Sequence, residues 1–375
     1  MNNENPYLSR QARLYVSIQN ASLDVLALNP GASLKYLTGL EFHLSERPVV
    51  AIFMPQSPLS IVLPELETAK TTHSPFPIQA FLYGENPVSW ILAFKQAVKS
   101  AQIEGNKRVG IEPRSLRMLE YQFLRDSAPE AQFISAEAEL AELRMRKGEN
   151  EIMAMRKAVE IAQAALGATL PSIKINMTER ELASELVLQL FRAGTDPDMP
   201  FSPIVSCGPN SANPHASPTD RRLTPGDLLV IDWGASHRGY CSDITRTFAI
   251  GEPEPEETRI AEIVLQANTA ARESARPSIQ ASRVDYAARY IIDQAGYGQY
   301  FTHRTGHGLG LEGHEPPYIR SDNELILRPG MAFTVEPGIY LPGRNGVRIE
   351  DNLVITDDGA VCLTDLPRDL QVIAS

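Results

Sequence analysis

The sequence predicts an α+β protein of two domains, in which a smaller α/β domain precedes a larger domain built from repeated units. The chain has 375 residues, and a domain holds roughly 100–200 residues, so two cores are expected. Short apolar runs alternate with helix patterns in the first part. In the second part, two helix patterns precede two strand patterns and the same order then recurs, which predicts a pseudo-duplicated unit of helix pair plus β-hairpin.

The composition argues against several classes of protein. Hydrophobic residues make up 43% of the chain, a fraction far above that of disordered chains. The formal net charge of -11 disfavours nucleic-acid partners, which are bound by clustered Lys and Arg. No apolar run reaches the roughly 18 residues that a membrane-spanning helix needs, and the polar segment MNNENPYLSRQAR lacks the apolar core of a secretory signal. We therefore expect a cytoplasmic protein with neither nucleic-acid nor membrane partners.

The first domain is predicted to cover residues 1–145. Apolar runs at residues 23–28 and 49–54 predict strands. A helix is predicted at residues 87–100, where the initial proline lacks only an N–H that the first turn of a helix leaves unbonded. A further strand and helix are predicted within residues 109–124. Because no His, Asp and Glu cluster with ligand-like spacing occurs here, we interpret this domain as a scaffold or oligomerisation domain.

The second domain is predicted to cover residues 146–375, beyond a charged linker, EAELAELRMRKGENEI, that runs into a helix. Thr178 and Glu181 form a capping box at the start of its second helix. The predicted elements are helices at residues 149–169 and 178–192, strands at 228–235 and 240–250, helices at 257–275 and 282–295, and strands at 331–336 and 346–355.

Both predicted hairpins carry carboxylates where strands should be apolar. Asp232 follows a run of four apolar residues, and Asp243 lies on the paired strand. Glu336 and Glu350 hold matching places in the second hairpin. A charged group is costly to bury unless it is paired or bound to a metal, and four clustered carboxylates would repel one another. Two divalent cations would remove that repulsion, whereas four unrelated surface or salt-bridged acids would not explain the matching positions.

Three histidines occur in the segment HRTGHGLGLEGHEPP, at His303, His307 and His314. Glycines flank His307 and allow the backbone to approach a ligand closely. A fourth histidine, His215, follows Pro214, which fixes the approach of the chain. A single histidine is more often a core residue than a ligand, but this grouping favours metal-ligating or catalytic roles.

With these motifs, the chain resembles the aminopeptidase P, prolidase and methionine aminopeptidase superfamily. The resemblance implies a C-terminal pita-bread domain, of the creatinase/aminopeptidase kind, after a creatinase-like N-terminal domain. Creatinase shares the fold but lacks metal ligands, so the five family ligands present here argue against a creatinase-like activity. The PTDR segment, GHGLGLEGHEPP and GVRIED resemble the proline-specific branch. The matching blocks are PFSPIVSCGPNSANPHASPTDR, GDLLVIDWGA, SDITRT, GHGLGLEGHEPP, FTVEPGIY and GVRIEDNLVIT.

The resemblance implies a site for two divalent metal ions. In it, Asp232 and Asp243 bind the pair of ions, with Asp243 bridging, while His307 and Glu336 hold one ion and Glu350 bridges both. One imidazole and four carboxylates make an oxygen-rich donor set, which favours Mn²⁺ or Co²⁺, with Zn²⁺ as the alternative. Thr245 and Arg348 are placed to orient Asp243 and Glu350 from behind. Arg348 is also predicted to face the substrate, and its alternative is a plain salt bridge.

The resemblance further implies hydrolysis of the bond between an N-terminal residue and proline, by an Xaa-Pro aminopeptidase or an Xaa-Pro dipeptidase. The partner is then a small peptide with proline at the second position, and relatives imply a homodimer formed through the first domain. The catalytic residues would be His314 at the developing oxyanion, His215 near the substrate or leaving group, and Glu336 as the proton shuttle. His303 would line the proline pocket, and its alternative is a structural hydrogen bond.

Two alternatives stay open at this level. Some archaeal dipeptidases of the family place an arginine four residues after the histidine that matches His314, but Tyr318 stands there in this chain. Arg320 or Arg344 could replace it and bind the carboxylate of a dipeptide. The other alternative is a metal-free binding module of the same fold, which the complete set of five ligands disfavours.

Overall fold

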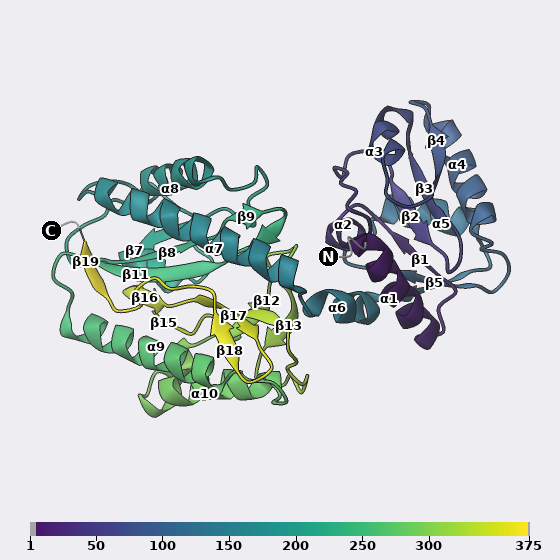
Figure 1. Cartoon of the computed structure of the whole chain (residues 1–375). Helices are drawn as coiled ribbons and strands as arrows, with labels where there is room; N and C mark the ends of the chain where they lie inside the picture. Colours follow the sequence, from purple (N-terminus) through teal and green to yellow (C-terminus); the bar gives the residue numbers. More distant parts are fainter. Residues whose placement is uncertain (1–4, 374–375) are drawn as a thin grey trace. The chain divides into compact units, whose positions relative to one another are not determined.

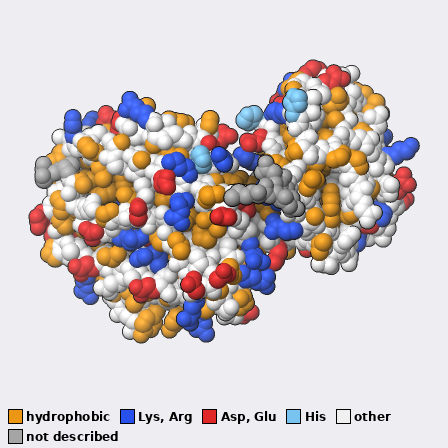
Figure 2. Space-filling model, viewed as in Figure 1, with side chains coloured by type: hydrophobic (Ala, Val, Ile, Leu, Met, Phe, Trp, Pro, Cys, Tyr) orange, Lys and Arg blue, Asp and Glu red, His pale blue; other side chains and the backbone are white. Residues whose placement is uncertain are grey.

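The computed structural model describes residues 5–373. Two compact units make up the chain, one spanning residues 1–144 and the other residues 145–375 (Figure 1). No helix within residues 5–373 is both long and apolar enough to cross a membrane. On the face drawn in Figure 2, Lys and Arg side chains are interspersed with Asp and Glu side chains over both units.

The N-terminal unit contains a six-stranded sheet flanked by helices. Its strands are β1 (Val25–Leu28), β2 (Val50–Phe53), β3 (Leu59–Pro64), β4 (Ile78–Tyr83), β5 (Arg108–Ile111) and β6 (Gln132–Ser135). They lie in the order β4-β3-β2-β1-β5-β6, with β1 parallel to β5 and antiparallel to β2. The α-helices are α1 (Pro6–Asn20), α2 (Ala32–Thr38), α3 (Ala69–Thr72), α4 (Pro87–Ser100), α5 (Met118–Ser127) and α6 (Glu137–Met145).

Local chemistry explains the best-predicted helix of this unit. The Asn86 side chain accepts a hydrogen bond from Val88 N, and Pro87 occupies the first turn, so α4 begins where the sequence predicts. Its buried face, which includes Phe94 and Ala97, packs into the core against the sheet. The predicted charged linker is itself helical over Glu137–Met145, because alternating Glu, Ala and Leu residues are strong helix formers.

The C-terminal unit places one helix pair on each side of its strands. The first pair is α7 (Glu149–Thr169) and α8 (Glu179–Ala193), and the second is α9 (Pro255–Ser274) and α10 (Ala281–Gln294). Figure 1 shows α7 and α8 on one side of the strands and α9 and α10 on the opposite side. The predicted capping box is present, because Thr178 and Glu181 exchange hydrogen bonds at the start of α8. The pseudo-duplicated order of elements is therefore confirmed.

Two curved sheets lie between these helix pairs. The first contains β7 (Ile204–Cys207), β8 (Leu228–Trp233), β11 (Ile244–Ile250) and β19 (Gln371–Ile373), in the order β19-β11-β8-β7. The second contains β12 (Gly306–Gly308), β13 (Glu315–Ile319), β14 (Ala332–Val335), β17 (Asp351–Ile355) and β18 (Ala360–Cys362), in the order β13-β12-β14-β17-β18. Short ribbons pair β9 (Ser236–His237) with β10 (Tyr240–Cys241) and β15 (Gly338–Leu341) with β16 (Asn345–Arg348).

The last predicted strand, residues 346–355, is broken in the structure. Its first part is β16, which pairs with β15, and its second part is β17, which pairs with β14. Glu350 lies at the break and forms an isolated bridge with Thr245 of β11. We call the part of the C-terminal unit that begins at α7 its first half and the part that begins at α9 its second half. The break therefore places a carboxylate of the second half against the first half.

Candidate metal centre and active site

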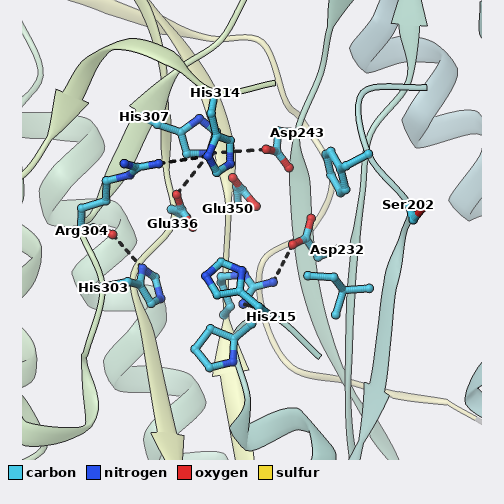
Figure 3. Close-up of a pocket in the computed structure, with 14 residues that line it drawn as sticks. Ser202, His215, Asp232, Asp243, His303, Arg304, His307, His314, Glu336 and Glu350 are labelled. Atoms are coloured by element: carbon cyan, nitrogen blue, oxygen red, sulfur yellow. Dashed lines mark hydrogen bonds and ion pairs between the residues drawn. The ribbon is translucent and has the colours of Figure 1, made fainter. Parts of the chain in front are cut away.

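A cavity of about 670 Å³ in the C-terminal unit is lined by nine residues that the sequence predicts as metal ligands, catalytic residues or substrate contacts. Figure 3 shows side chains from both halves of the unit pointing toward one another. The nine are His215, Asp232, Asp243, His303, His307, His314, Glu336, Arg348 and Glu350. Five further residues complete the lining, namely Phe201, Ser202, Ile204, Pro214 and Arg304.

The strands position the four carboxylates. Asp232 lies within β8, opposite Thr245 of β11 in the antiparallel pair. Asp243 comes just before β11 rather than on it, which corrects the predicted strand position. Glu336 follows β14 directly, and its backbone N–H donates to the Thr305 carbonyl. Each acid therefore lies in or beside a buried strand, where its position is set by the register of the sheet.

The potential ligand atoms form two groups that share one residue. One ligand atom each from Asp232, Asp243 and Glu350 lies within 4.8 Å of the others, and the same holds for His307, Glu336 and Glu350. Glu350 is therefore common to both groups. His314 also approaches the site, because a third group joins it with Asp243 and His307.

The hydrogen bonds of His307 determine which ring nitrogen faces the carboxylates. Its Nδ1 lies 3.1 Å from the Gly308 carbonyl, and a carbonyl can only accept, so Nδ1 carries the proton. The unprotonated Nε2 then lies 3.5 Å from Asp243 Oδ2 and 3.4 Å from Glu336 Oε1. Three atoms with lone pairs thus face one another, an arrangement that a cation between them would stabilise.

Burial and mutual repulsion disfavour the charged forms of these acids in the absence of a cation. Burial, followed by the charges of Glu350, Asp232 and Glu336, holds the pKa of Asp243 well above its usual value. Burial, followed by Glu336 and Asp232, does the same to the pKa of Glu350. Burial raises the pKa of Glu336 to about 7, against the opposing effect of Arg348.

The donor set fits divalent cations. Asp232 Oδ1 is buried and has no hydrogen-bond partner among residues 5–373, which is costly for a carboxylate oxygen unless an ion binds it. Oxygen atoms dominate the donors, with a single unprotonated imidazole nitrogen among them, and hard or borderline divalent ions prefer such a set. Each of the two three-residue groups that share Glu350 could hold a metal ion.

A buried polar network supports the ligands from behind. Thr245 Oγ1 donates to Glu350 Oε2 at 2.6 Å and accepts from Arg348 Nε at 3.0 Å. Arg348 Nη2 donates to Asp232 Oδ2 at 2.6 Å. Thr245 thus contacts Glu350 and not Asp243 as the sequence spacing suggested. The backbone of Asp243 is held instead by the Asn352 carboxamide, which bonds both its N–H and its carbonyl.

Arg348 and His303 line the cavity but have their polar atoms engaged within the protein. Besides the bonds above, Arg348 Nη1 donates to the Tyr340 hydroxyl at 3.0 Å and the Pro214 carbonyl at 3.2 Å. His303 Nδ1 donates to the Arg304 carbonyl at 2.7 Å, and its Nε2 lies 2.8 Å from the Tyr340 hydroxyl. Burial lowers the pKa of His303 to about 3, so its ring is neutral and forms part of the cavity wall without adding a charge to it.

Arg304 is a cavity residue that the sequence reasoning missed. Its Nη2 lies 3.1 Å from His314 Nδ1 (Figure 3), and arginine can only donate, so the His314 proton must lie on Nε2. The guanidinium also lies over the Tyr318 ring, 4.6 Å from its centroid. Partial burial and the Arg304 charge lower the pKa of His314 to about 4. The only signal in the sequence was a cation inside the histidine-rich segment.

The two arginines proposed from the sequence lie elsewhere. Arg320 pairs with Asp322 at 2.9 Å, and Arg344 pairs with Glu256. Neither lines the cavity. In contrast, Arg304 makes no ion pair with a carboxylate within residues 5–373. Of the three arginines, Arg304 is thus the one available to a negatively charged ligand in the cavity.

Comparison with known proteins agrees with this geometry. Residues 153–357 match the model of metallopeptidase family M24, and residues 10–146 match that of the creatinase/prolidase N-terminal domain. An Xaa-Pro dipeptidase of Lactobacillus helveticus is 35% identical over 357 residues, which are 95% of this chain and 96% of that relative.

Solved structures show the same similarity. The prolidase of Thermococcus sibiricus has a TM-score of 0.93 and 33% identity, covering 99% of this chain and 100% of that one. The X-Pro aminopeptidase of Thermotoga maritima has a TM-score of 0.85 and 31% identity, covering 97% and 99%. The pita-bread domain and the creatinase-like domain before it are thereby confirmed. The chain belongs to metallopeptidase family M24 and is a peptidase.

Proposed function

We propose that the protein is an Xaa-Pro dipeptidase that uses two divalent metal ions. The observation that carries this choice is Arg304, which lines the cavity beside His314 and has no carboxylate partner among the described residues. In a dipeptide, the free carboxylate lies a single residue beyond the bond to be cleaved. An arginine near the catalytic histidine is the chemistry that would bind it, through charge-assisted hydrogen bonds. An aminopeptidase would leave this position open for a longer chain.

The metal ions would be held by the residues that the sequence predicts. Asp232, Asp243 and Glu350 would bind one ion, and His307, Glu336 and Glu350 the other, with Asp243 close to both. When bound, divalent ions supply Lewis-acid polarisation of the substrate carbonyl and hydroxide at neutral pH. We expect Mn²⁺ or Co²⁺, with Zn²⁺ as the alternative, because carboxylates dominate the donors. The five donors together argue against the alternative of a metal-free binding module.

The remaining residues bind substrate and move protons. His314, with its proton on Nε2, would donate to the oxyanion that develops on the substrate carbonyl. The Glu336 side chain is 15% exposed, compared with 6% for Asp243, so it is the more accessible carboxylate for proton transfer to the prolyl nitrogen. His215 is exposed at the cavity wall and would contact the substrate near the leaving group. His303 would form part of the proline pocket.

The test compares three substrates that differ only beyond the proline: an Xaa-Pro dipeptide, its amide and an Xaa-Pro-Xaa tripeptide. We expect the wild type to prefer the dipeptide. Arg304→Met should lower kcat/KM for the dipeptide relative to the amide by roughly 10–100-fold, the usual value of a hydrogen bond to a charged group. Arg320→Met is the matched control and should leave this ratio unchanged. A wild type that cleaves the tripeptide as fast as the dipeptide would establish an aminopeptidase instead.

A further inference from the structure

Two buried carboxylates hold the segments that carry the substrate-facing side chains. Both lie outside the cavity, one on the second helix of each pair. We propose that Glu179 and Asp285 are matched positioning residues, each of which orients one side of the substrate site through a threonine. The inference rests on the proposed function, because it assumes that His215 and Arg304 contact substrate. Neither carboxylate lines the cavity, so each can act only through the segment that it holds.

Glu179 is the first residue of α8 and is fully buried. Its carboxylate accepts hydrogen bonds from both ends of residues 207–219, the segment in which His215 lines the cavity. The helix N-terminus favours its negative charge. The bonds that it accepts come from Cys207 N at 2.7 Å, Asn210 Nδ2 at 3.1 Å to each oxygen, Thr219 N at 2.9 Å and Thr219 Oγ1 at 2.6 Å.

Asp285, on α10, is also fully buried and also accepts hydrogen bonds from a segment that lines the cavity. It accepts from Thr305 N at 3.1 Å and Thr305 Oγ1 at 2.8 Å, so a threonine is again held by both its backbone and its hydroxyl. Arg289 pairs with Asp285 and donates to the carbonyls of Phe301 and His303. This network fixes the backbone on both sides of Arg304.

The chemistry of these groups favours orientation over simple stabilisation. An ionised carboxylate is an acceptor only, so every donor around it must point at the same place, which fixes the path of the segment. Burying such a charge is costly, and apolar replacements of buried ion pairs are often neutral or stabilising. A requirement for a defined loop geometry accounts for a carboxylate at both positions, because a misplacement of about 1 Å at an active site can cost roughly 10²-fold in rate.

The test is a crossed set of double mutants measured on metal-loaded, folded protein. Glu179→Gln should lower kcat/KM for an Xaa-Pro dipeptide by roughly 10–100-fold in the wild-type background, but by less than about twofold in a His215→Ala background. Asp285→Asn should likewise lose its effect in an Arg304→Met background. In the crossed backgrounds, Glu179→Gln with Arg304→Met and Asp285→Asn with His215→Ala, the losses should multiply. Metal content should stay at the wild-type value throughout.

Glu179→Gln and Asp285→Asn leave buried donors without a charged acceptor, so either variant could unfold. Thr219→Val and Thr305→Val are the milder substitutes, since each removes one hydroxyl and keeps the shape, and they should give the same crossed pattern with smaller losses. Equal fold-losses in matched and crossed backgrounds, with His215→Ala itself impaired, would overturn the inference and leave the proposed function intact. Wild-type rates in His215→Ala would instead overturn its assigned role, and the inference with it.

Discussion

The two halves of the C-terminal unit share their order of elements but differ in what they contribute to the cavity. The first half supplies Asp232 from β8 and Asp243 from the position just before β11, the regular antiparallel partner of β8, which is buried along its whole length. The second half supplies Glu336, Glu350 and the histidine-rich segment from shorter strands, with a bulge after His307 and a break at Glu350. Duplication thus repeats the scaffold, while both halves supply proposed ligands and the irregular half also supplies the groups proposed to handle protons.

This difference teaches how the irregular half of one fold can carry groups proposed to move protons beside proposed metal ligands, while the regular half carries proposed ligands alone. Buried strand positions hold a carboxylate rigidly and exclude water, which suits a metal ligand. Irregular backbone can aim a side chain into open space, which suits a group that must reach substrate. His314, on the loop before β13, is exposed, whereas Asp243 is buried. The experiments below test whether the halves divide the work in this way.

The largest effect should come from losing a ligand of the first half. Asp243→Asn should lower kcat by roughly 10³-fold or more, because the Lewis-acid contribution of a metal site is worth several kcal/mol. Steady-state kinetics with saturating Mn²⁺ would measure it. Asp322→Asn, at an exposed acid outside the cavity, is the control. Near wild-type turnover in Asp243→Asn would show that the first half is not needed for the chemistry.

Loss of a proton-handling group of the second half should be the next largest effect. Glu336→Gln and His314→Ala should each lower kcat by roughly 10²–10⁴-fold, the usual range for acid–base and oxyanion groups. His314→Ala should keep its bound metal, because that side chain is assigned to the substrate. If His314→Ala lost metal and activity together, the histidine would be a ligand, and its assignment as a substrate-facing group of the second half would fail.

Metal removal should produce a smaller, thermodynamic effect. Binding that favours the folded state stabilises it by about 2.7 kcal/mol at a free ion concentration of 100 times Kd. Chelated protein should therefore melt at a lower temperature in differential scanning calorimetry and recover on addition of Mn²⁺ or Co²⁺. Identical melting curves with and without chelator, for protein whose metal has been removed, would contradict a site built from mutually repelling acids.

The smallest effect should come from the network that links the halves. Thr245→Val removes the hydroxyl that donates to Glu350, a bond to a charged group worth about 1.5–3 kcal/mol. Thr247→Val on the same strand is the matched control, since its hydroxyl bonds only the Arg348 backbone, donating to the carbonyl and accepting from the N–H, and such neutral bonds are worth about 0.5–1.5 kcal/mol each. Isothermal titration should show weaker metal binding only for Thr245→Val. Equal affinities in the two variants would remove Thr245 from the metal site.

Much of the site could be predicted because its residues break local rules. Asp232 follows one apolar run, and Glu336 lies at the end of another. Neither strand needs a carboxylate there in order to form, so each acid indicates a functional role. The helices were predicted well where caps and periodicity agree, as at Thr178. The family motifs then implied the histidines, and the structure brings all of them into one cavity.

The remainder depends on contacts between distant segments. Nothing in residues 346–355 marks the break at Glu350, because strand-forming apolar residues lie on both sides of it and only pairing with β15 and β14 separates the two parts. Glu179 and Asp285 look like ordinary helix residues in the sequence, and their partners lie 40 and 20 residues away. Arg304 has no distinguishing signal in the sequence, and only the fold places it over Tyr318 and beside His314.

Elemental analysis of freshly purified, active protein tests the central claim most directly. The account predicts two divalent transition-metal ions per chain in the wild type and a clear loss of bound metal in both Asp243→Asn and Glu350→Gln, one substitution in each half. Full peptidase activity in protein that holds no stoichiometric metal would contradict it.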